Sequence, residues 1–146
     1  MPRRAEIPDP LEYNAATAEE FRANGGRVTG DFEGRPLLLL TTTGARTGAE
    51  RTSPLIYTMD GDRYVVTAAA GGAPQHPAWY HNLVAEPRVT VEVGSEKFGA
   101  RAIEPGGEER ERLFAERCVA TPNFRIYQDK TERRIPIIVL EREAGG

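Results

Sequence analysis

The sequence predicts a mainly β protein with short helices, an α+β fold built as a small, largely antiparallel barrel. Two observations carry this prediction. About six strand-like segments follow one another along 146 residues, and most neighbouring segments are joined by tight turns. A doubly wound sheet would need alternating β and α units, which this chain lacks.

The first 16 residues are rich in proline, alanine and charge, and we expect them to form a flexible N-terminal arm. Residues 17–146 then form one domain. Thr17 and Glu20 have the spacing of a helix N-cap and its capping partner, so a short helix should begin at Thr17. Phe21 is the only large apolar residue of this helix and should provide its packing contact.

Apolar and threonine-rich runs predict three strands, at Leu37–Thr43, Thr52–Met59 and Arg63–Ala69. Asp60-Gly61-Asp62 joins the last two and indicates a hairpin, because aspartate-glycine pairs adopt the turns that connect antiparallel strands. Pro77 favours the first position of a helix, so a helix is expected from Pro77 to Ala85.

The C-terminal half predicts a second hairpin followed by helices and a last strand. Arg88–Val93 alternates valine with polar residues and turns into Lys97–Ile103. Gly106–Ala120 has the pattern of an amphipathic surface helix with a solvated charged face. Phe124–Lys130 reads as a short helix or loop, and Ile135–Leu140 as a strand whose proline marks a sheet edge or the strand's start.

Composition limits the function classes. The chain carries 22 acidic and 19 basic side chains, for a net charge of −3, which predicts no general attraction to nucleic acid. The single cysteine, Cys118, suits the reducing cytoplasm. No apolar run approaches the roughly 20 residues that span a bilayer. We expect a cytoplasmic protein with at most peripheral membrane contact, and its oligomeric state stays open.

The stretch Thr67–Leu83 predicts a binding cradle. It places a glycine pair, Gly71-Gly72, between a strand and a helix start. Glycine permits positive φ and close backbone approach, and the first amides of a helix have no partners inside the helix. This arrangement suits an anion or a cofactor.

The loop Gly44–Gly48 is the second candidate site. Arg46 and Arg51 are suitable charge-assisted donors for a phosphate, and Thr47 is a neutral one. The alternative interpretation is a hairpin turn with solvated arginines. The loop matches neither a P-loop nor a dinucleotide-binding fingerprint.

Other chemistry is poorly supported. His76 and His81 are five residues apart, whereas helical zinc pairs prefer four, so we predict no metal site. No serine or cysteine stands in a nucleophile motif. Trp79 is better interpreted as a core residue. Tyr127 stands among polar residues, where an exposed phenol is suited to donate a hydrogen bond or a proton.

Four segments carry a resemblance. They read PLLLLTTTGARTG, PLIYTMDGDRYVVTAAAGGAPQHPAWYHNL, EPRVTVEVG and YQDKTERRIPIIVLER. Together they resemble the deazaflavin-dependent nitroreductase family, a branch of the split β-barrel flavin and deazaflavin oxidoreductases, over residues 21–142. The resemblance implies a split β-barrel of the flavin-reductase or FMN-binding kind. It also implies 8-hydroxy-5-deazaflavin, coenzyme F-420, as hydride carrier. Such a cofactor carries the chemistry itself, which is consistent with the absence of a nucleophile motif from the sequence.

By matching motif positions, the resemblance assigns residues to cofactor and substrate. Three would hold the anionic phosphate and tail: Arg46, Thr47 and Arg51. Those along the ring system and linker would be Ser53, Pro54, Leu55, Ile56, Ala69, Ala70, Gly71 and Gly72, with Trp79 and Asn82 bounding the same groove. The acceptor would meet Ile56, Phe124 and Tyr127, with Tyr127 as the catalytic proton donor.

This chain departs from the family pattern at functional positions. Ala69-Ala70 stands where many relatives have serine and lysine. A charge-assisted hydrogen bond is worth about 1.5 to 3 kcal/mol, so we expect cofactor affinity weaker by roughly tenfold or more. Ile56, Thr121 and Phe124 stand where the nitroimidazole-reducing type has tyrosines, so nitroaromatic reduction should be weak or adventitious.

The resulting expectation is an oxidoreductase that transfers a hydride from reduced coenzyme F-420 to an electron-poor acceptor such as a quinone. Two alternatives stay open. An FMN-dependent oxidoreductase could use the same barrel, and a non-catalytic protein could store the deazaflavin. Titration with both cofactors tests the first, and acceptor-dependent oxidation of the reduced cofactor tests the second.

Overall fold

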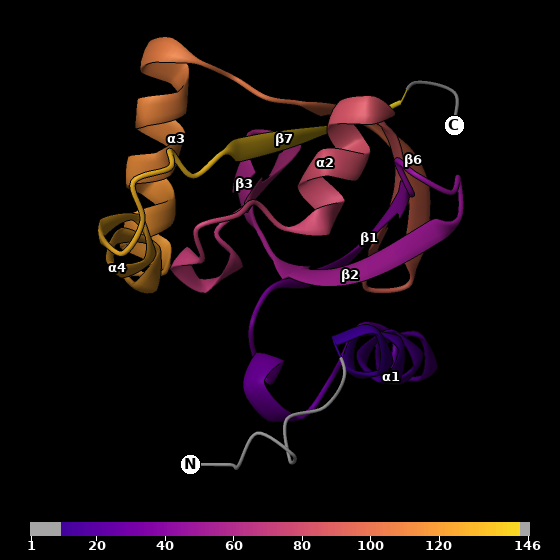
Figure 1. Ribbon diagram of the computed structural model, residues 1–146. Coiled ribbons are helices and arrows are strands. Elements are labelled where there is room, and N and C mark those ends of the chain that lie inside the picture. The colour runs from indigo at the N-terminus through magenta and orange to yellow at the C-terminus, as the bar shows by residue number, and fades with distance from the viewer. Residues whose placement is uncertain (1–9, 144–146) are drawn as a thin grey trace.

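The computed structural model describes residues 10–143. Seven strands form one curled antiparallel sheet, and four α-helices pack around it (Figure 1). The strands are β1 (Leu37–Thr43), β2 (Glu50–Ile56), β3 (Thr58–Asp60), β4 (Arg63–Thr67), β5 (Arg88–Val93), β6 (Glu96–Ile103) and β7 (Ile137–Arg142). The helices are α1 (Pro10–Ala23), α2 (Ala78–Ala85), α3 (Gly107–Ala120) and α4 (Asn123–Asp129), with short 3-10 turns η2 (Gly30–Phe32) and η3 (Ala70–Gly72). No helix in this part of the chain is both long enough and apolar enough to cross a membrane.

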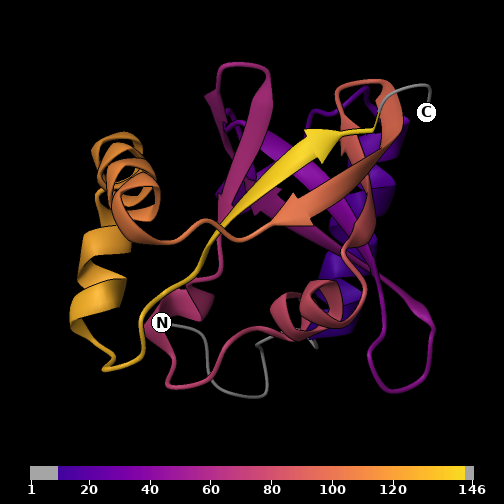
Figure 2. The ribbon, with the colours of Figure 1, turned by 90° about the horizontal axis from the view of Figure 1, so that it is seen from above.

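The sheet order is β2-β1-β5-β6-β7-β4-β3, and every neighbouring pair is antiparallel. Its two edge strands, β2 and β3, are separated in the sequence by Tyr57 alone. The chain therefore passes from one edge of the sheet to the other within one residue, and the strands curve around a common interior (Figure 2). The predicted antiparallel barrel is confirmed.

The prediction of one strand over residues 52–59 is wrong, because the chain leaves the first ladder at Tyr57. The Tyr57 amide donates to the carbonyl of Pro36 at 3.0 Å. Its ring packs edge-on against Tyr64 with centroids 5.3 Å apart. We call this break between β2 and β3 the seam of the barrel.

Both predicted hairpins are confirmed. In β3–β4, Asp60 faces Arg63 across a two-residue turn, and in β5–β6, Val93 faces Glu96. Each turn has its glycine in the left-handed region, with φ of 65° at Gly61 and 57° at Gly94. The sequence signal was reliable because this conformation strongly favours glycine.

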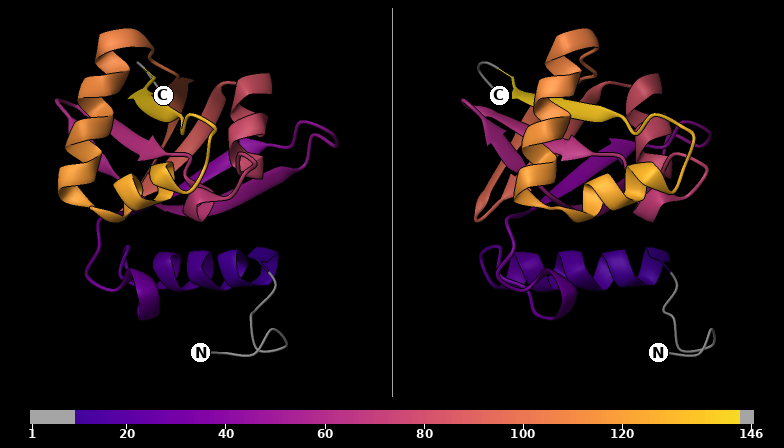
Figure 3. Two further views of the ribbon diagram at one scale, coloured as in Figure 1. Left: turned by 60° about the vertical axis from the view of Figure 1, so that its left-hand side comes forward. Right: turned by 90° about the vertical axis from the view of Figure 1, so that its left-hand side faces the viewer.

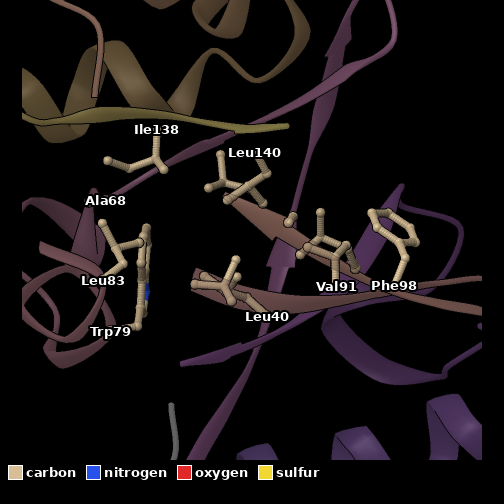
Figure 4. Packing of buried hydrophobic residues seen from close by; sticks show 12 residues of the cluster. Leu40, Ala68, Trp79, Leu83, Val91, Phe98, Ile138 and Leu140 are labelled. Atoms are coloured by element: carbon tan, nitrogen blue, oxygen red, sulfur yellow. The ribbon is translucent and has the colours of Figure 1, made fainter. Parts of the chain in front are cut away.

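The barrel interior holds the main core (Figure 4), made of Leu38, Leu40, Val66, Ala68, Trp79, Leu83, Val89, Val91, Phe98, Ala100, Ile138 and Leu140. Strand β1 is buried on both faces. Leu38 and Leu40 face this interior, whereas Leu37 and Leu39 pack with Phe21 of α1 outside it. Burial on both faces explains the unbroken run of four leucines.

Helix α1 runs as a layer beneath the barrel (Figure 3). It begins at Pro10, so the prediction of a start at Thr17 is wrong: Thr17 lies inside the helix and is buried. Phe21 is the expected packing contact, at 1% exposure. Arg22 adds a bidentate pair to Glu92 of β5, at 2.9 and 2.7 Å. Residues 1–9, the rest of the predicted arm, lie outside the described residues.

Helices α3 and α4 pack on another side of the barrel (Figure 3) and build a second core against β4 and β7. Helix α3 is confirmed, but its charged face is not fully solvated as predicted. Arg110 and Arg117 are buried, at 7% and 1% exposure. Both donate to backbone carbonyl oxygens, those of Ile135 and Ile56.

Strand β7 begins at Ile137, directly after Pro136, and is paired on both sides, by β6 and β4. The proline therefore marks the start of a central strand. It does not mark a sheet edge.

Candidate cofactor site

A groove of about 910 Å³ opens between α1, the β1–β2 loop and the start of α2. This volume lies in the range of small-molecule and cofactor sites. Its lining comprises Asn14, Ala15, Ala18, Arg22, Gly44, Ala45, Arg46, Thr47, Glu50, Arg51, Thr52, Ser53, Pro77, Ala78, Trp79, His81 and Asn82. We call it the arginine groove, after Arg46 and Arg51.

The loop at one side of the groove is a tight turn that needs its glycines. The amide of Gly44 donates to Ala49 at 2.7 Å, and the amide of Gly48 donates back to Gly44 at 2.9 Å. Gly48 has a φ of 73°, and a Cβ at Gly44 would lie 2.9 Å from the Ala49 oxygen. The Thr47 hydroxyl accepts from the Ala49 amide at 3.2 Å. The loop is thus a hairpin turn, as the alternative interpretation held, and it also lines the groove.

Arg46 and Arg51 are exposed in the groove lining. Among the side chains that the structure describes, those of residues 14–143 apart from 31 and 71, neither forms an ion pair with a carboxylate, and the Arg51 guanidinium donates only to the backbone oxygen of Glu50, at 3.1 Å. Arg22 differs, because Glu92 neutralises it and Arg22 in turn holds the pKa of Glu92 below its usual value. Two cationic side chains are therefore available to an anion.

Asn82 fixes the arginine loop to α2. It is buried, its Oδ1 accepts from the Ala45 amide at 3.0 Å, and its Nδ2 donates to Thr42 Oγ1 at 3.1 Å. Trp79, one turn earlier, lies beside Leu83 in the barrel core (Figure 4) and also lines the groove. The core interpretation of Trp79 is confirmed.

The glycine segment does not line the arginine groove. Its turn, η3, lies against α4, where a Cβ at Gly72 would be 2.8 Å from the Tyr127 carbonyl oxygen. Gly72 has a φ of 82°, and Ala70 has a φ of 49°, which is unfavourable for a residue with a side chain. Something outside the segment must hold this conformation.

Arg133 provides that support. Its guanidinium donates to the carbonyl oxygens of Ala69 at 2.6 Å, Ala73 at 2.8 Å and Ala68 at 3.1 Å. Its Nη1 also lies 2.9 Å from His76 Nδ1. Burial and the nearby Arg133 charge lower the pKa of His76, which favours the neutral imidazole that can accept this bond. No sequence pattern marks Arg133 for this role.

The predicted site residues therefore fall into two places. Those in the arginine groove are Arg46, Thr47, Arg51, Ser53, Trp79 and Asn82. Those outside it are Pro54, Leu55, Ile56, Ala69, Ala70, Gly71, Gly72, Phe124 and Tyr127. Strand β2 connects the two places, since it leads from Arg51 to Ile56 at the seam.

Tyr127 is partly buried, so the prediction of a freely exposed phenol is wrong. Its ring lies 6.2 Å from that of Phe124, edge to face, and it packs against the second core. Gly72 approaches its backbone closely. Sequence context suggested exposure because the neighbouring residues are polar, but on the short helix α4 this side chain packs against Phe124 and the second core.

Sequence reasoning missed Arg117 altogether. Its Nε donates to Thr67 Oγ1 at 2.8 Å and its Nη2 to the Ile56 oxygen at 2.9 Å. The guanidinium lies 4.7 Å from the centre of the Phe124 ring. Burial lowers the pKa of Arg117 to about 10. In the sequence it was one of several charged residues in a polar helix, with no signal to separate it from the others.

A curled antiparallel sheet whose edge strands follow each other in the chain has the architecture of the split-barrel class, and the cation-lined groove beside it suits an anionic cofactor. Residues 14–142 match the F420H(2)-dependent quinone reductase family, and the chain belongs to this family. It is thus an oxidoreductase of a family that uses coenzyme F-420, as the resemblance implied.

Similar proteins and solved structures support the family assignment. An F420H(2)-dependent quinone reductase of Mycobacterium tuberculosis strain H37Rv is 41% identical over 126 residues, 84% of this chain and 85% of the relative. A solved F420-H2 dependent reductase, FDR-A, is 41% identical with a TM-score of 0.68, over 73% of this chain and 95% of that one. A domain-swapped dimer is 36% identical with a TM-score of 0.70, over 91% and 100% of the two chains.

Proposed function

We propose that this chain transfers a hydride from reduced coenzyme F-420 to a quinone. The arginine groove is the observation that supports this proposal. It has the volume of a cofactor site, and two of its lining arginines have no carboxylate partner within the described residues. A phosphorylated cofactor would supply the missing negative charge.

The residues present fit the deazaflavin at both ends of β2. At the loop, Arg46, Arg51 and the Thr47 hydroxyl are donors suited to a phosphate and an anionic tail. At the seam, Arg117 Nη1 is a buried donor without a hydrogen-bond partner. When bound, the reduced deazaflavin supplies the hydride from its C5.

The chain's own residues would position the reaction and manage a proton. Ser53 to Ile56 would lie along the ring, and the segment held by Arg133 would face it from the other side. Phe124 and Tyr127 would border the acceptor. A quinone that takes up a hydride and one proton becomes a quinol, and we assign the proton to the Tyr127 phenol or to solvent.

The first test measures binding. Deazaflavin and FMN are titrated separately into the purified protein and followed by fluorescence. We expect deazaflavin to bind more tightly. Arg46→Ala and Arg51→Ala should each weaken its binding by about tenfold at low salt, from the loss of a charge-assisted contact at an exposed site. Arg101→Ala, an exposed change on β6 outside the groove, is the matched control.

The second test measures turnover. Reduced deazaflavin bound to the protein is mixed with menadione, and its oxidation is followed by absorbance. We expect quinone-dependent oxidation, with nitroimidazoles reacting far more slowly. Tighter FMN binding would contradict the cofactor assignment, and no acceptor-dependent oxidation would favour a storage protein.

A third test addresses the proton. Tyr127→Phe should slow quinone reduction and change its pH profile. Menadione reduction at the wild-type rate across the pH range would leave solvent as the proton source.

A further inference from the structure

Arg117 is a buried cation that the protein does not neutralise. It is 1% exposed, and among the side chains described in residues 14–143, apart from 31 and 71, no carboxylate pairs with it. Removing a charge from water is costly unless an opposite charge compensates it. With a pKa of about 10, the side chain still carries its positive charge at neutral pH. An uncompensated buried charge of this kind calls for a functional explanation.

Its contacts join three parts of the predicted ring and acceptor site. Nη2 binds the carbonyl of Ile56 at the end of β2, and Nε binds the hydroxyl of Thr67 at the end of β4. The ring of Phe124, from α4, stacks under the guanidinium. Arg117 therefore holds the two strand ends beside the seam and the aromatic wall in one arrangement.

One donor remains unused. Nη1 is shielded from solvent and has no hydrogen-bond partner in the part of the chain that the structure describes. Native proteins leave few such groups, because an unmade buried hydrogen bond carries a free-energy penalty. The positive charge and the free donor together match a negatively charged or carbonyl oxygen at the seam.

Arg110 provides an internal comparison. It lies seven residues earlier on α3, is 7% exposed, stacks on Phe114 at 4.4 Å and donates to the carbonyl of Ile135. Unlike Arg117, it also pairs with a carboxylate, that of Glu111, at 3.2 Å. Among the described residues both arginines keep one buried donor without a hydrogen-bond partner, Nε in Arg110 and Nη1 in Arg117. What distinguishes Arg117 is that it has no carboxylate partner there and lies beside the predicted site.

We propose that Arg117 is a positioning residue for quinone reduction, which keeps Ile56 and Phe124 in place and sets an uncompensated positive charge beside the acceptor. This inference rests on the proposed function. When a hydride reaches a quinone, its electron pair leaves one quinone oxygen as an oxyanion until a proton converts it to the quinol. A fixed cation in a site of low dielectric stabilises that charge as it develops.

The experiment compares Arg117→Met and Arg117→Lys with Arg110→Met. Stability is measured by urea denaturation, and kcat and KM for menadione are measured with reduced deazaflavin. We expect Arg117→Met to lower kcat at least tenfold with a smaller change in KM, and Arg117→Lys to recover part of it. Arg110→Met should stay within twofold in both constants, even when its loss of stability is as large.

A spectroscopic readout needs no turnover. The 8-hydroxyl of bound oxidised deazaflavin is a phenol whose ionisation is followed by absorbance. A unit charge about 10 Å away at an effective dielectric near 20 changes such a pKa by about one. Arg117→Met should therefore raise the apparent pKa of the bound hydroxyl by about one, and Arg110→Met should leave it unchanged.

The inference is overturned if Arg117→Met keeps kcat within twofold of wild type and leaves the hydroxyl pKa in place. A wild-type protein that does not reduce menadione contradicts the proposed function, while the hydroxyl titration still decides the role of Arg117. If Arg117→Met does not fold, Thr67→Val and Arg117→Lys replace it. Both loosen the guanidinium contacts and should lower kcat several-fold, and unchanged kcat in both would count against the inference.

Discussion

Replacing Arg133 by methionine should loosen the glycine segment, residues 68–73, because the Arg133 guanidinium donates to carbonyl oxygens at both ends of it. Arg133 binds three carbonyl oxygens between Ala68 and Ala73 and contacts the His76 imidazole. Methionine keeps much of the aliphatic length and removes every donor. The strained turn at Ala70, with its φ of 49°, would then depend on local packing and on its own backbone hydrogen bonds, from the Gly72 and Ala73 amides.

The magnitude follows from the type of contact. Hydrogen bonds to a charged group contribute about 1.5 to 3 kcal/mol each. Arg133 is only partly buried, so the released carbonyls regain water, and relaxation of Ala70 returns about 1 to 2 kcal/mol of strain. We therefore expect the free energy of unfolding to fall by about 2 to 4 kcal/mol, well below the sum of the separate bonds.

The assay is urea denaturation at neutral pH, together with a deazaflavin titration. The midpoint should fall with the m-value unchanged, since the loss is local and the fold persists. Deazaflavin should bind more weakly, because the segment borders the proposed ring position. Arg133→Lys is the control. Because an ammonium is a single point donor, lysine should recover less than half of the free energy of unfolding that Arg133→Met loses.

A loss below about 1 kcal/mol for Arg133→Met would refute the reasoning, because it would mean that water replaces the guanidinium at little cost. If Arg133→Lys were as stable as wild type, the several donors of the forked guanidinium would not be needed, and a single positive charge would be enough.

Three further predictions concern the same fold. Gly72→Ala should lower the free energy of unfolding by about 2 kcal/mol or more, since its Cβ would lie 2.8 Å from the Tyr127 oxygen at a φ of 82°. Glu92→Gln should cost stability at neutral pH but progressively less in acid. Arg22 lowers the pKa of Glu92, so their pair contributes fully above the ordinary carboxyl value of 4.5 and is lost as the pH falls below it. Ala70→Lys should tighten deazaflavin binding about tenfold, because it restores a charge-assisted donor without a new Cβ.

Each has a matched control. Gly61→Ala, also at positive φ but with no atom within 4 Å of its Cβ, should cost less than Gly72→Ala. Glu96→Gln removes a pair with Arg142 that is mostly exposed, and should show the smaller pH effect. Denaturation curves across pH check both, and equal effects in either comparison would contradict the prediction. For Ala70→Lys, unchanged affinity would mean that the side chain at position 70 reaches no anionic group of the deazaflavin.

The barrel was predictable because its signals are local. Four leucines followed by three threonines favour a strand, and Asp60-Gly61 indicates a hairpin within four residues. The resemblance added the family, which the comparisons confirm. The resemblance also placed Arg46 and Asn82 in one site, although its physical basis, the bond from the Ala45 amide to Asn82, joins residues 37 apart.

The features that the sequence did not predict depend on contacts between residues far apart in the chain, which a short stretch of sequence does not reveal. Tyr57 reads as the middle of one strand, and only the meeting of both sheet edges turns it into a seam. Arg117 and Arg133 read as surface charges. They are held inside by bonds to backbone carbonyl oxygens, those of Ile56 and Ala69 among them, which lie far from the arginines in the sequence. Buried charge is set by tertiary geometry, whereas sequence patterns report mainly the average preference of a residue type.

The separation of the two predicted groups is itself informative about the ligand. Arg51 and Ile56 stand at opposite ends of β2, five residues apart, which for a strand is on the order of 17 Å. A small acceptor or a free phosphate can occupy only one end. A single ligand that uses both the arginine loop and the seam must be long, with its anionic part at the loop and its planar part at the seam. This requirement matches a phosphorylated tail joined to a ring, and it places the buried charge of Arg117 at the ring end, where hydride transfer would occur.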